Sequence, residues 1–181
     1  MLFRSIGWAA RKRRRAENPD RDLSNVADEL CEAGRFGQKT GAGFYRYEAG
    51  SRNAIPDPTV TAIIEKFRQQ KGITPRKVSN EEIVESCIYA LVNEGARIVE
   101  DGIAQRSSDI DIVYLNGYGF PPWRGGPMFY ADQLGLSEVA RSLRAIAENA
   151  RADKAFWTPA PLLARLAQEG KTFSAYKGSD K

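Results

Sequence analysis

The chain has 181 residues, of which 42% are apolar and 10% aromatic, so it can bury a core that suits one domain or one and a half. It contains no histidine, which excludes an imidazole as catalytic base, catalytic acid or metal ligand. The net charge of +4 comes largely from the run between Arg11 and Arg15; because the rest of the chain is nearly balanced, the charge does not predict a nucleic-acid-binding protein.

The cysteines and the hydropathy pattern predict a reduced, soluble protein. Cys31 and Cys87 each lie among helix-forming residues without a partner at a characteristic spacing, which argues against a disulfide framework and against a zinc site. No stretch approaches the roughly 18 consecutive apolar residues that a membrane-spanning helix needs. We therefore expect a cytoplasmic protein with no membrane span; an Arg-rich mitochondrial presequence at the N-terminus is the less favoured alternative.

Two helices are predicted in the first 34 residues. The first runs from Ser5 to about Glu17 and ends at Asn18-Pro19; the second follows a cap within Asp22-Leu23-Ser24 and closes at Gly34. Five consecutive basic residues surround a helix rather than line one face of it. We therefore expect the run between Arg11 and Arg15 to be solvated, and no nucleic-acid partner.

A glycine-punctuated arm follows, from Gly34 to Tyr47. Its aromatic residues predict a connector that is anchored against another surface. The segment from Gly37 to Gly43 resembles a phosphate loop, but Lys39-Thr40 precedes the paired glycines and no helix begins after them. A structural turn is favoured, and an anion contact is the alternative.

The next helix begins at Asp57-Pro58 and stops at Gly72, with an apolar face made of Val60, Ile63, Ile64 and Phe67. The strongest periodic signal then begins at the Ser79 capping box and continues to Asp101-Gly102. On this central helix we expect one apolar face and one polar face. The apolar face comprises Val84, Cys87, Ile88, Leu91, Val92 and Val99, and the polar face Glu82, Ser86, Asn93, Arg97 and Glu100.

Asn93-Glu94, in the middle of the central helix, is a candidate for either a structural or a functional role. Asn is a poor helix former, so its presence indicates a hydrogen bond from its side chain to a neighbouring element. The sequence does not decide between the two roles.

Shorter helices complete the chain. One is capped by Ser107 or Ser108 and ends at Gly117, another opens at Pro127, a third is capped by Ser137, and the last runs from Pro161 to Gly170. No run alternates apolar and polar residues between turns in the way that a strand would. The predicted fold is therefore all-α, without a Rossmann domain.

The segment between Gly117 and Pro127 is the most unusual part of the chain, with four glycines and three prolines in eleven positions. Such a composition predicts a tightly folded turn, and its aromatic residues indicate that the turn is packed. For Arg124 we favour a buried ion pair over stacking on the Trp123 indole. The candidate structural or interface residues are Asn93, Glu94, Gly119, Pro121, Trp123, Arg124, Gly126 and Pro127.

Four pieces of the chain, in this order, resemble the C-terminal region of the multifunctional fatty-acid oxidation enzymes. They are the arm from Gly34 to Tyr47, Leu91 to Ala96, Ser108 to Asp111, and Gly117 to Pro127. In that family a crotonase-like hydratase domain precedes a Rossmann domain for NAD and two helical repeats of the 3-hydroxyacyl-CoA dehydrogenase C-terminal type. The resemblance implies a remnant of the first repeat in residues 1–34, an arm and connecting helix in 35–78, and the second repeat in 79–181.

The resemblance also implies that this chain by itself is inactive. The catalytic His-Glu dyad and the NAD turn of the family lie in the Rossmann domain, and the position that matches a substrate-facing Asn of the first repeat is Glu85 here. We therefore predict no catalytic residue, and no cofactor-binding or metal-binding residue, in this chain. The second repeat of the family is mainly structural, so we expect either a homo-oligomer or docking on the missing Rossmann and first-repeat domains.

Two functions follow from these expectations. The first is the C-terminal part of an NAD-dependent 3-hydroxyacyl-CoA dehydrogenase, for which acyl-CoA is a substrate only in the complete enzyme. The second is an independent helical module for oligomerisation or interaction. Both predict a stable helical fold, and only the first predicts that the missing domains restore activity.

Overall fold

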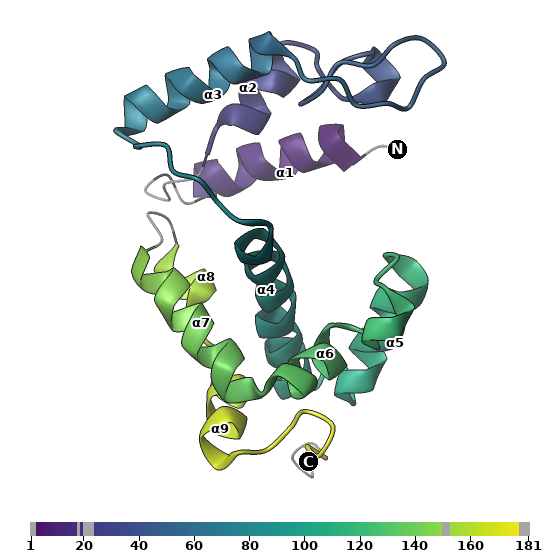
Figure 1. Ribbon diagram of the computed structural model, residues 1–181, viewed down its shortest axis with the longest axis vertical. Helices are drawn as coiled ribbons and strands as arrows, with labels where there is room; N and C mark the ends of the chain where they lie inside the picture. The colour runs from purple at the N-terminus through teal and green to yellow at the C-terminus, as the bar shows by residue number, and fades with distance from the viewer. Residues whose placement is uncertain (1–2, 18, 20–23, 150–152, 178–181) are drawn as a thin grey trace. The chain divides into compact units, whose positions relative to one another are not determined.

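A computed structural model describes residues 3–17, 19, 24–149 and 153–177 of the chain. These residues form two compact units, Met1–Lys77 and Val78–Lys181, here called unit 1 and unit 2. Helices dominate both units (Figure 1). Within the described ranges no strand forms, and β-type pairing is limited to isolated bridges between Gly37 and Ile55, such as Arg46 with Ile55. The prediction of an all-α chain is confirmed.

Unit 1 contains α1 (Phe3–Glu17), α2 (Val26–Glu32), a short 3₁₀ helix η1 (Gln38–Thr40) and α3 (Pro58–Lys71). The expected ends of α3 are confirmed: the Asp57 side chain accepts from the Thr59 N–H at 3.0 Å, and Gly72 ends the helix in the left-handed conformation. Of the predicted α2 cap, Asp22 and Leu23 lie outside the described residues. The helix begins after Asn25 rather than after Ser24.

The core of unit 1 is small. Val26 and Leu30 of α2 are buried against Val60 of α3, and half-buried apolar side chains surround them. These surrounding side chains are Phe44, Ile63, Ile64 and Phe67. The predicted apolar face of α3 is therefore correct, and Phe44 is the aromatic residue through which the arm reaches this core.

The basic run on α1 is not wholly solvated, so that expectation is wrong in part. Arg11 and Arg15 lie four residues apart on one face of α1, and both pair with the buried carboxylate of Asp28, at 2.6 and 2.5 Å. Lys12, between them, lies over the Trp8 ring at 4.1 Å. The basic residues surround α1 as predicted, but α1 packs on α2, and α2 supplies the buried Asp28 that pairs with one side of the run.

The arm is a hydrogen-bonded turn. The Gly37 N–H donates to Ala42 O at 2.7 Å, and Gly41 takes the left-handed conformation that ends η1. The Arg35 guanidinium donates to Gly43 O and forms an ion pair with Asp57. The segment from Gly37 to Gly43 is therefore built as the favoured structural turn, and an anion contact there stays untested.

Unit 2 contains the remaining elements: α4 (Asn80–Glu100), α5 (Ser107–Gly117), the 3₁₀ helix η2 (Pro122–Arg124), α6 (Pro127–Leu134), α7 (Leu136–Asn149), α8 (Lys154–Trp157) and α9 (Pro161–Glu169). The start of α6 at Pro127 and the end of α9 at Gly170 are confirmed, and the Ser79 side chain accepts from the Glu82 N–H at the start of α4. The helix α8 was not predicted from the sequence.

Two predicted serine caps are wrong. At the start of α5 the residue before the helix is Arg106, and its backbone N–H donates to the Asp109 carboxylate at 2.9 Å. The helix α7 begins one residue before Ser137, whose hydroxyl donates to Ala167 O at 2.9 Å and so ties α7 to α9. At α7 the Glu138 and Val139 N–H groups donate to Gly135 O, so the Ser137 hydroxyl is not used as a cap.

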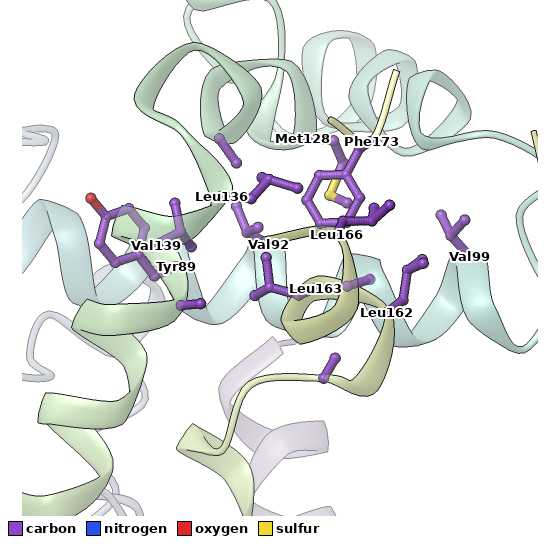
Figure 2. Close-up of a cluster of buried hydrophobic side chains, with 14 of the residues drawn as sticks. Tyr89, Val92, Val99, Met128, Leu136, Val139, Leu162, Leu163, Leu166 and Phe173 are labelled. Atoms are coloured by element: carbon purple, nitrogen blue, oxygen red, sulfur yellow. The ribbon is translucent and has the colours of Figure 1, made fainter. Parts of the chain in front are cut away.

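Apolar side chains from α4, α6, α7 and α9 form the core of unit 2. Figure 2 shows Leu162, Leu163 and Leu166 of α9 gathered with Val92 of α4 and Met128 of α6. The two-faced prediction for α4 is correct for Val92 and Val99, which are buried, but wrong in register for other residues. Val84 is 53% exposed, whereas Asn93, assigned to the polar face, is 1% exposed. The buried face of α4 is Tyr89, Val92, Asn93, Gly95, Ala96 and Val99.

The register differs because close packing, rather than the number of aliphatic residues, decides which face of α4 is buried. The small residues Gly95 and Ala96 let other helices approach closely: a Cβ on Gly95 would clash with the Met128 sulfur of α6. Asn93 can be buried because its polar atoms are paired.

Candidate functional site

The turn between Gly117 and Pro127 links α5 to α6, and one carboxylate fixes its exit. Asp111, on the buried side of α5, accepts from the Met128 N–H at 2.7 Å through Oδ1 and from the Phe129 N–H at 3.1 Å through Oδ2. These N–H groups belong to the first turn of α6, where a helix has no partners of its own. Asp111 therefore acts as a cap supplied by a different helix.

The pKa of Asp111 reflects two opposing effects. Burial raises the pKa of the carboxyl to about 6, although the two N–H bonds from Met128 and Phe129 favour the charged form and lower it. The charge of Asp132 adds to the upward shift. Desolvation is the largest of these effects. With a pKa of about 6, Asp111 is mostly a carboxylate at pH 7 and takes up a proton in mild acid.

Gly126 is required by this arrangement. Its φ is +99°, and a Cβ placed on it would overlap the Cβ and carboxyl atoms of Asp111. Gly125, with φ of +72°, would similarly drive a Cβ into the Phe129 ring. The paired glycines thus let the turn pass directly over Asp111. Pro127 follows as the first residue of α6, where its missing N–H is not needed.

Asn93 secures the loop between α8 and α9. Its Nδ2 donates to the carbonyl oxygens of Phe156 and Thr158, at 3.1 and 3.0 Å, and its Oδ1 accepts from the Ala160 N–H at 2.7 Å. One turn further along α4, Arg97 donates to the same two carbonyl groups. The predicted hydrogen bond to a neighbouring element is confirmed. Glu94 is exposed and pairs with Arg97 at 3.1 Å.

Three acidic residues that hold backbone groups were missed as site residues in the sequence: Asp111, described above, Glu100 and Asp132. Glu100 accepts from the Leu162 N–H at 3.1 Å, at the start of α9. Asp132 accepts from the Phe173 and Ser174 N–H groups, at 2.7 and 2.9 Å, and from the Ser174 hydroxyl. Glu100 is the last residue of α4, and Asp132 lies in the last turn of α6. In the sequence these residues appear only as acids beside apolar helical positions. That pattern does not reveal which distant backbone group an acid binds.

The exposed side of the turn carries Trp123 and Arg124. Trp123 is 82% exposed. The Arg124 side chain is exposed too, and its guanidinium lies over the Tyr130 ring at 4.9 Å. The expected buried ion pair is therefore wrong: η2 directs Arg124 to the surface, where it stacks on an aromatic ring, though not on the indole.

Other residues named in the sequence have structural positions. Gly119 takes a φ of +71°, Pro121 precedes η2, and Phe120 is buried beneath the turn. Glu85 is exposed on α4. In the described ranges, no three His, Cys, Asp or Glu side chains come together as a metal site would require. None of the described helices combines the length and apolar character needed to cross a membrane.

The chain is similar to known proteins over most of its length. Residues 4–47 and 83–177 match the family described as 3-hydroxyacyl-CoA dehydrogenase, C-terminal domain. The chain is 43% identical over 178 residues to the peroxisomal bifunctional enzyme of Danio rerio, covering 91% of this chain and 25% of the relative. It is 36% identical over 160 residues to the peroxisomal fatty acid beta-oxidation multifunctional protein AIM1 of Arabidopsis thaliana, covering 86% and 22%.

A bacterial relative extends the same similarity. The chain is 34% identical over 169 residues to the fatty acid oxidation complex subunit alpha of Pseudomonas savastanoi, covering 90% of this chain and 22% of that protein. The chain thus spans about a quarter of the length of the curated relatives that it matches. With its all-α fold and its match over both segments, the chain belongs to the family of the 3-hydroxyacyl-CoA dehydrogenase C-terminal domain.

Proposed function

We propose that this chain is the C-terminal helical part of an NAD-dependent 3-hydroxyacyl-CoA dehydrogenase of fatty-acid β-oxidation, with a structural role in that enzyme. The observation that carries the proposal is how the polar residues of unit 2 are used. Asn93, Asp111 and Asp132 each bind two or more backbone groups of another element, as residues that position helices do.

NAD would be held elsewhere in such an enzyme. A dinucleotide site is built from a strand, a glycine-rich turn and a helix, and the described residues form no strand. The described residues therefore do not fit NAD, and we assign them no step of hydride transfer. Acyl-CoA would likewise be a substrate of the complete enzyme only.

The proposed domain organisation is a first-repeat remnant in residues 1–34, an arm and connecting helix in 35–78, and a second repeat in 79–181. The division of the described residues into compact units between Lys77 and Val78 supports the start proposed for the second repeat.

Reconstitution tests this function. The purified chain is assayed for NAD-linked oxidation of 3-hydroxybutyryl-CoA, alone and mixed with a separately produced NAD-binding domain plus first repeat from the Danio rerio relative. We expect activity only in the mixture. Activity of the chain alone would contradict the structural role, and no activity in either sample, together with no binding between the two parts, would contradict membership of such an enzyme.

An independent interaction module is the second candidate function. The exposed aromatic side chains Tyr118 and Trp123, which are 74% and 82% exposed, favour it, because large exposed apolar side chains mark surfaces that partners cover. The expected state is a homo-oligomer. Size-exclusion chromatography with light scattering checks it, and a monomer at all concentrations would contradict it.

The location within the cell stays a proposal as well. The predicted cytoplasmic location has the reduced cysteines in its favour, since Cys31 and Cys87 are both free thiols. The relatives are named as peroxisomal in Danio rerio and glyoxysomal in Brassica napus, which favours such an organelle instead. Imaging of the tagged chain together with a peroxisomal marker would decide between the two.

A further inference from the structure

Unit 2 contains a groove of about 630 Å³ between α5, the start of α6 and the segment after α9. This volume lies within the usual range of small-molecule sites, so it is large enough for a single side chain of any kind. Ile112 and Leu115 of α5 and Phe129 of α6 make part of its wall apolar. The groove can therefore receive a large apolar side chain.

Trp123 is the side chain that suits this groove, because it lies close to the groove in the chain but is not covered by its own chain. Gly125 lines the groove, whereas Trp123, two residues earlier on η2, is 82% exposed. A Trp side chain buries roughly 150–250 Å² when it is covered, so its exposure to water is unfavourable. Trp123 is thus free to enter the groove of another copy of the chain.

The charge of this surface favours a second copy over a strongly charged partner. Residues 112–123, which connect the groove wall on α5 to Trp123, contain no charged side chain. Two copies of such a surface can meet without like-charge repulsion and without burial of an unpaired charge. The neighbouring Arg124 lies over the Tyr130 ring at 4.9 Å, so its charge already has an aromatic partner.

A cation that lines the groove also suits an indole. Lys177 is exposed and forms part of the groove wall. A Lys ammonium within about 6 Å of an aromatic ring is attracted to the face of that ring, and Trp binds a cation better than Tyr or Phe does. An incoming Trp123 would therefore contact both apolar side chains and a cation, and both contacts favour it.

We propose that two copies of this chain form a dimer in which Trp123 of each copy inserts into the groove of the other. Because Gly125 of the groove wall is only two residues from Trp123, one two-fold axis can form both contacts together. The proposal rests on the second candidate function, the interaction module, and names its partner and its contact surface. The interface is small, so we expect a weak dimer with a dissociation constant of about 10 μM.

Sedimentation equilibrium of the full chain at several concentrations tests the proposal. Trp123→Ala removes the inserted side chain and should weaken the dimer at least about thirtyfold, since a buried Trp is typical of interface hot spots. Ile112→Glu places a charge in the groove wall and should weaken the dimer to a similar extent. The matched control is Ile83→Glu on the first turn of α4, which should dimerise as the wild type does. Ile83 and Ile112 are 50% and 57% exposed, but only Ile112 lines the groove.

A mixture of the two variants tests the reciprocal insertion directly. The Trp123→Ala chain keeps its groove and the Ile112→Glu chain keeps its Trp123, so one of the two contacts can form between them. Neither contact can form in a sample of one variant alone. We therefore expect the mixture to associate about tenfold more tightly than either variant by itself. Circular dichroism confirms that each variant is folded.

Three results would overturn the proposal. A Trp123→Ala chain that dimerises as the wild type does would leave the interaction module in place but assign it another surface. A mixture that associates no more tightly than its component variants would exclude the reciprocal insertion. A wild-type chain that stays monomeric at every concentration would overturn the interaction module as well. Because Trp123 is exposed, its variant keeps the test valid even if Ile112→Glu fails to fold.

Discussion

The two units stabilise a buried aspartate in different ways. In unit 1, where the apolar core is small, two guanidinium groups from α1 neutralise Asp28, so charge pairing holds α1 to α2. In unit 2, two neutral N–H groups of α6 hold Asp111, beside a core of many apolar side chains. Unit 1 should therefore depend on charge, and unit 2 on packing and on exact hydrogen-bond geometry.

The largest effect is expected from Asn93→Ala in unit 2. The substitution leaves the Ala160 N–H without a partner and leaves the Phe156 and Thr158 carbonyl groups bonded to Arg97 alone. An unsatisfied buried group costs about 1–3 kcal/mol and each lost bond about 1 kcal/mol more, so we expect a loss of about 4 kcal/mol. Urea unfolding measures it. Asn116→Ala, which removes one exposed bond to Ile112 O, is the control. A loss below about 1 kcal/mol for Asn93→Ala would show that Arg97 holds the loop alone.

Gly126→Ala should follow, with a loss of about 3 kcal/mol, because the added Cβ overlaps Asp111 and the residue keeps a positive φ. Gly117→Ala is the matched control: a Cβ added there would meet no atom of the described residues within 4 Å, its chain neighbours aside, so we expect a change below about 1 kcal/mol. Thermal unfolding compares the two. Equal effects would mean that the turn can move away from Asp111.

The pH dependence of Asp111 gives the third test. Its pKa is raised to about 6, so between about pH 4 and 6 the folded chain keeps a proton that the unfolded chain has released. Stability from this group is therefore fully present below about pH 4 and falls as pH rises to about 6, by roughly 3 kcal/mol at most.

The Asp111→Asn variant isolates this contribution. The difference in urea unfolding free energy between wild type and Asp111→Asn should change across that range of pH, whereas the difference for the control Asp109→Asn should not show the same fall. A wild-type advantage over Asp111→Asn that grows as pH rises would indicate that the N–H bonds outweigh desolvation.

In unit 1, Asp28→Asn should cost about 2 kcal/mol, since Arg11 and Arg15 lose the charge that they share but are partly exposed and can reach water. Hydrogen exchange should report the loss in α1 and α2. Added salt should lessen the difference from wild type, unlike that for Asn93→Ala. Glu17→Gln, which removes an exposed pair with Arg13, is the control and should be nearly neutral.

The smallest effect on stability is expected from Trp123→Ala. Because this side chain is 82% exposed, its removal should change the unfolding free energy by less than about 0.5 kcal/mol. If the turn is an interaction surface, the same variant should shift the oligomer equilibrium seen by light scattering. A large loss of stability in a monomeric sample would contradict that exposed position.

Helix ends were predictable wherever a local signal was unambiguous. Asp57-Pro58, Ser79, Pro127 and Gly170 lie where the sequence placed them, because each cap or stop depends on the backbone within a few residues. The caps at Ser107 and Ser137 were wrong because α5 begins at Ser107 itself and α7 begins one residue before Ser137. The short helix α8 was missed because four residues give no periodicity.

Sequence alone determined the all-α class, the family, and the need for a tight turn before Pro127, since these depend on periodicity, motif order and the conformations open to glycine and proline. Tertiary structure decided which face of α4 is buried, which acids hold backbone groups, and that Arg124 is exposed. Those outcomes depend on which elements contact one another. Burial of Asn93 or Asp111 is favourable only when the fold places backbone N–H or carbonyl groups of a distant segment within hydrogen-bond distance.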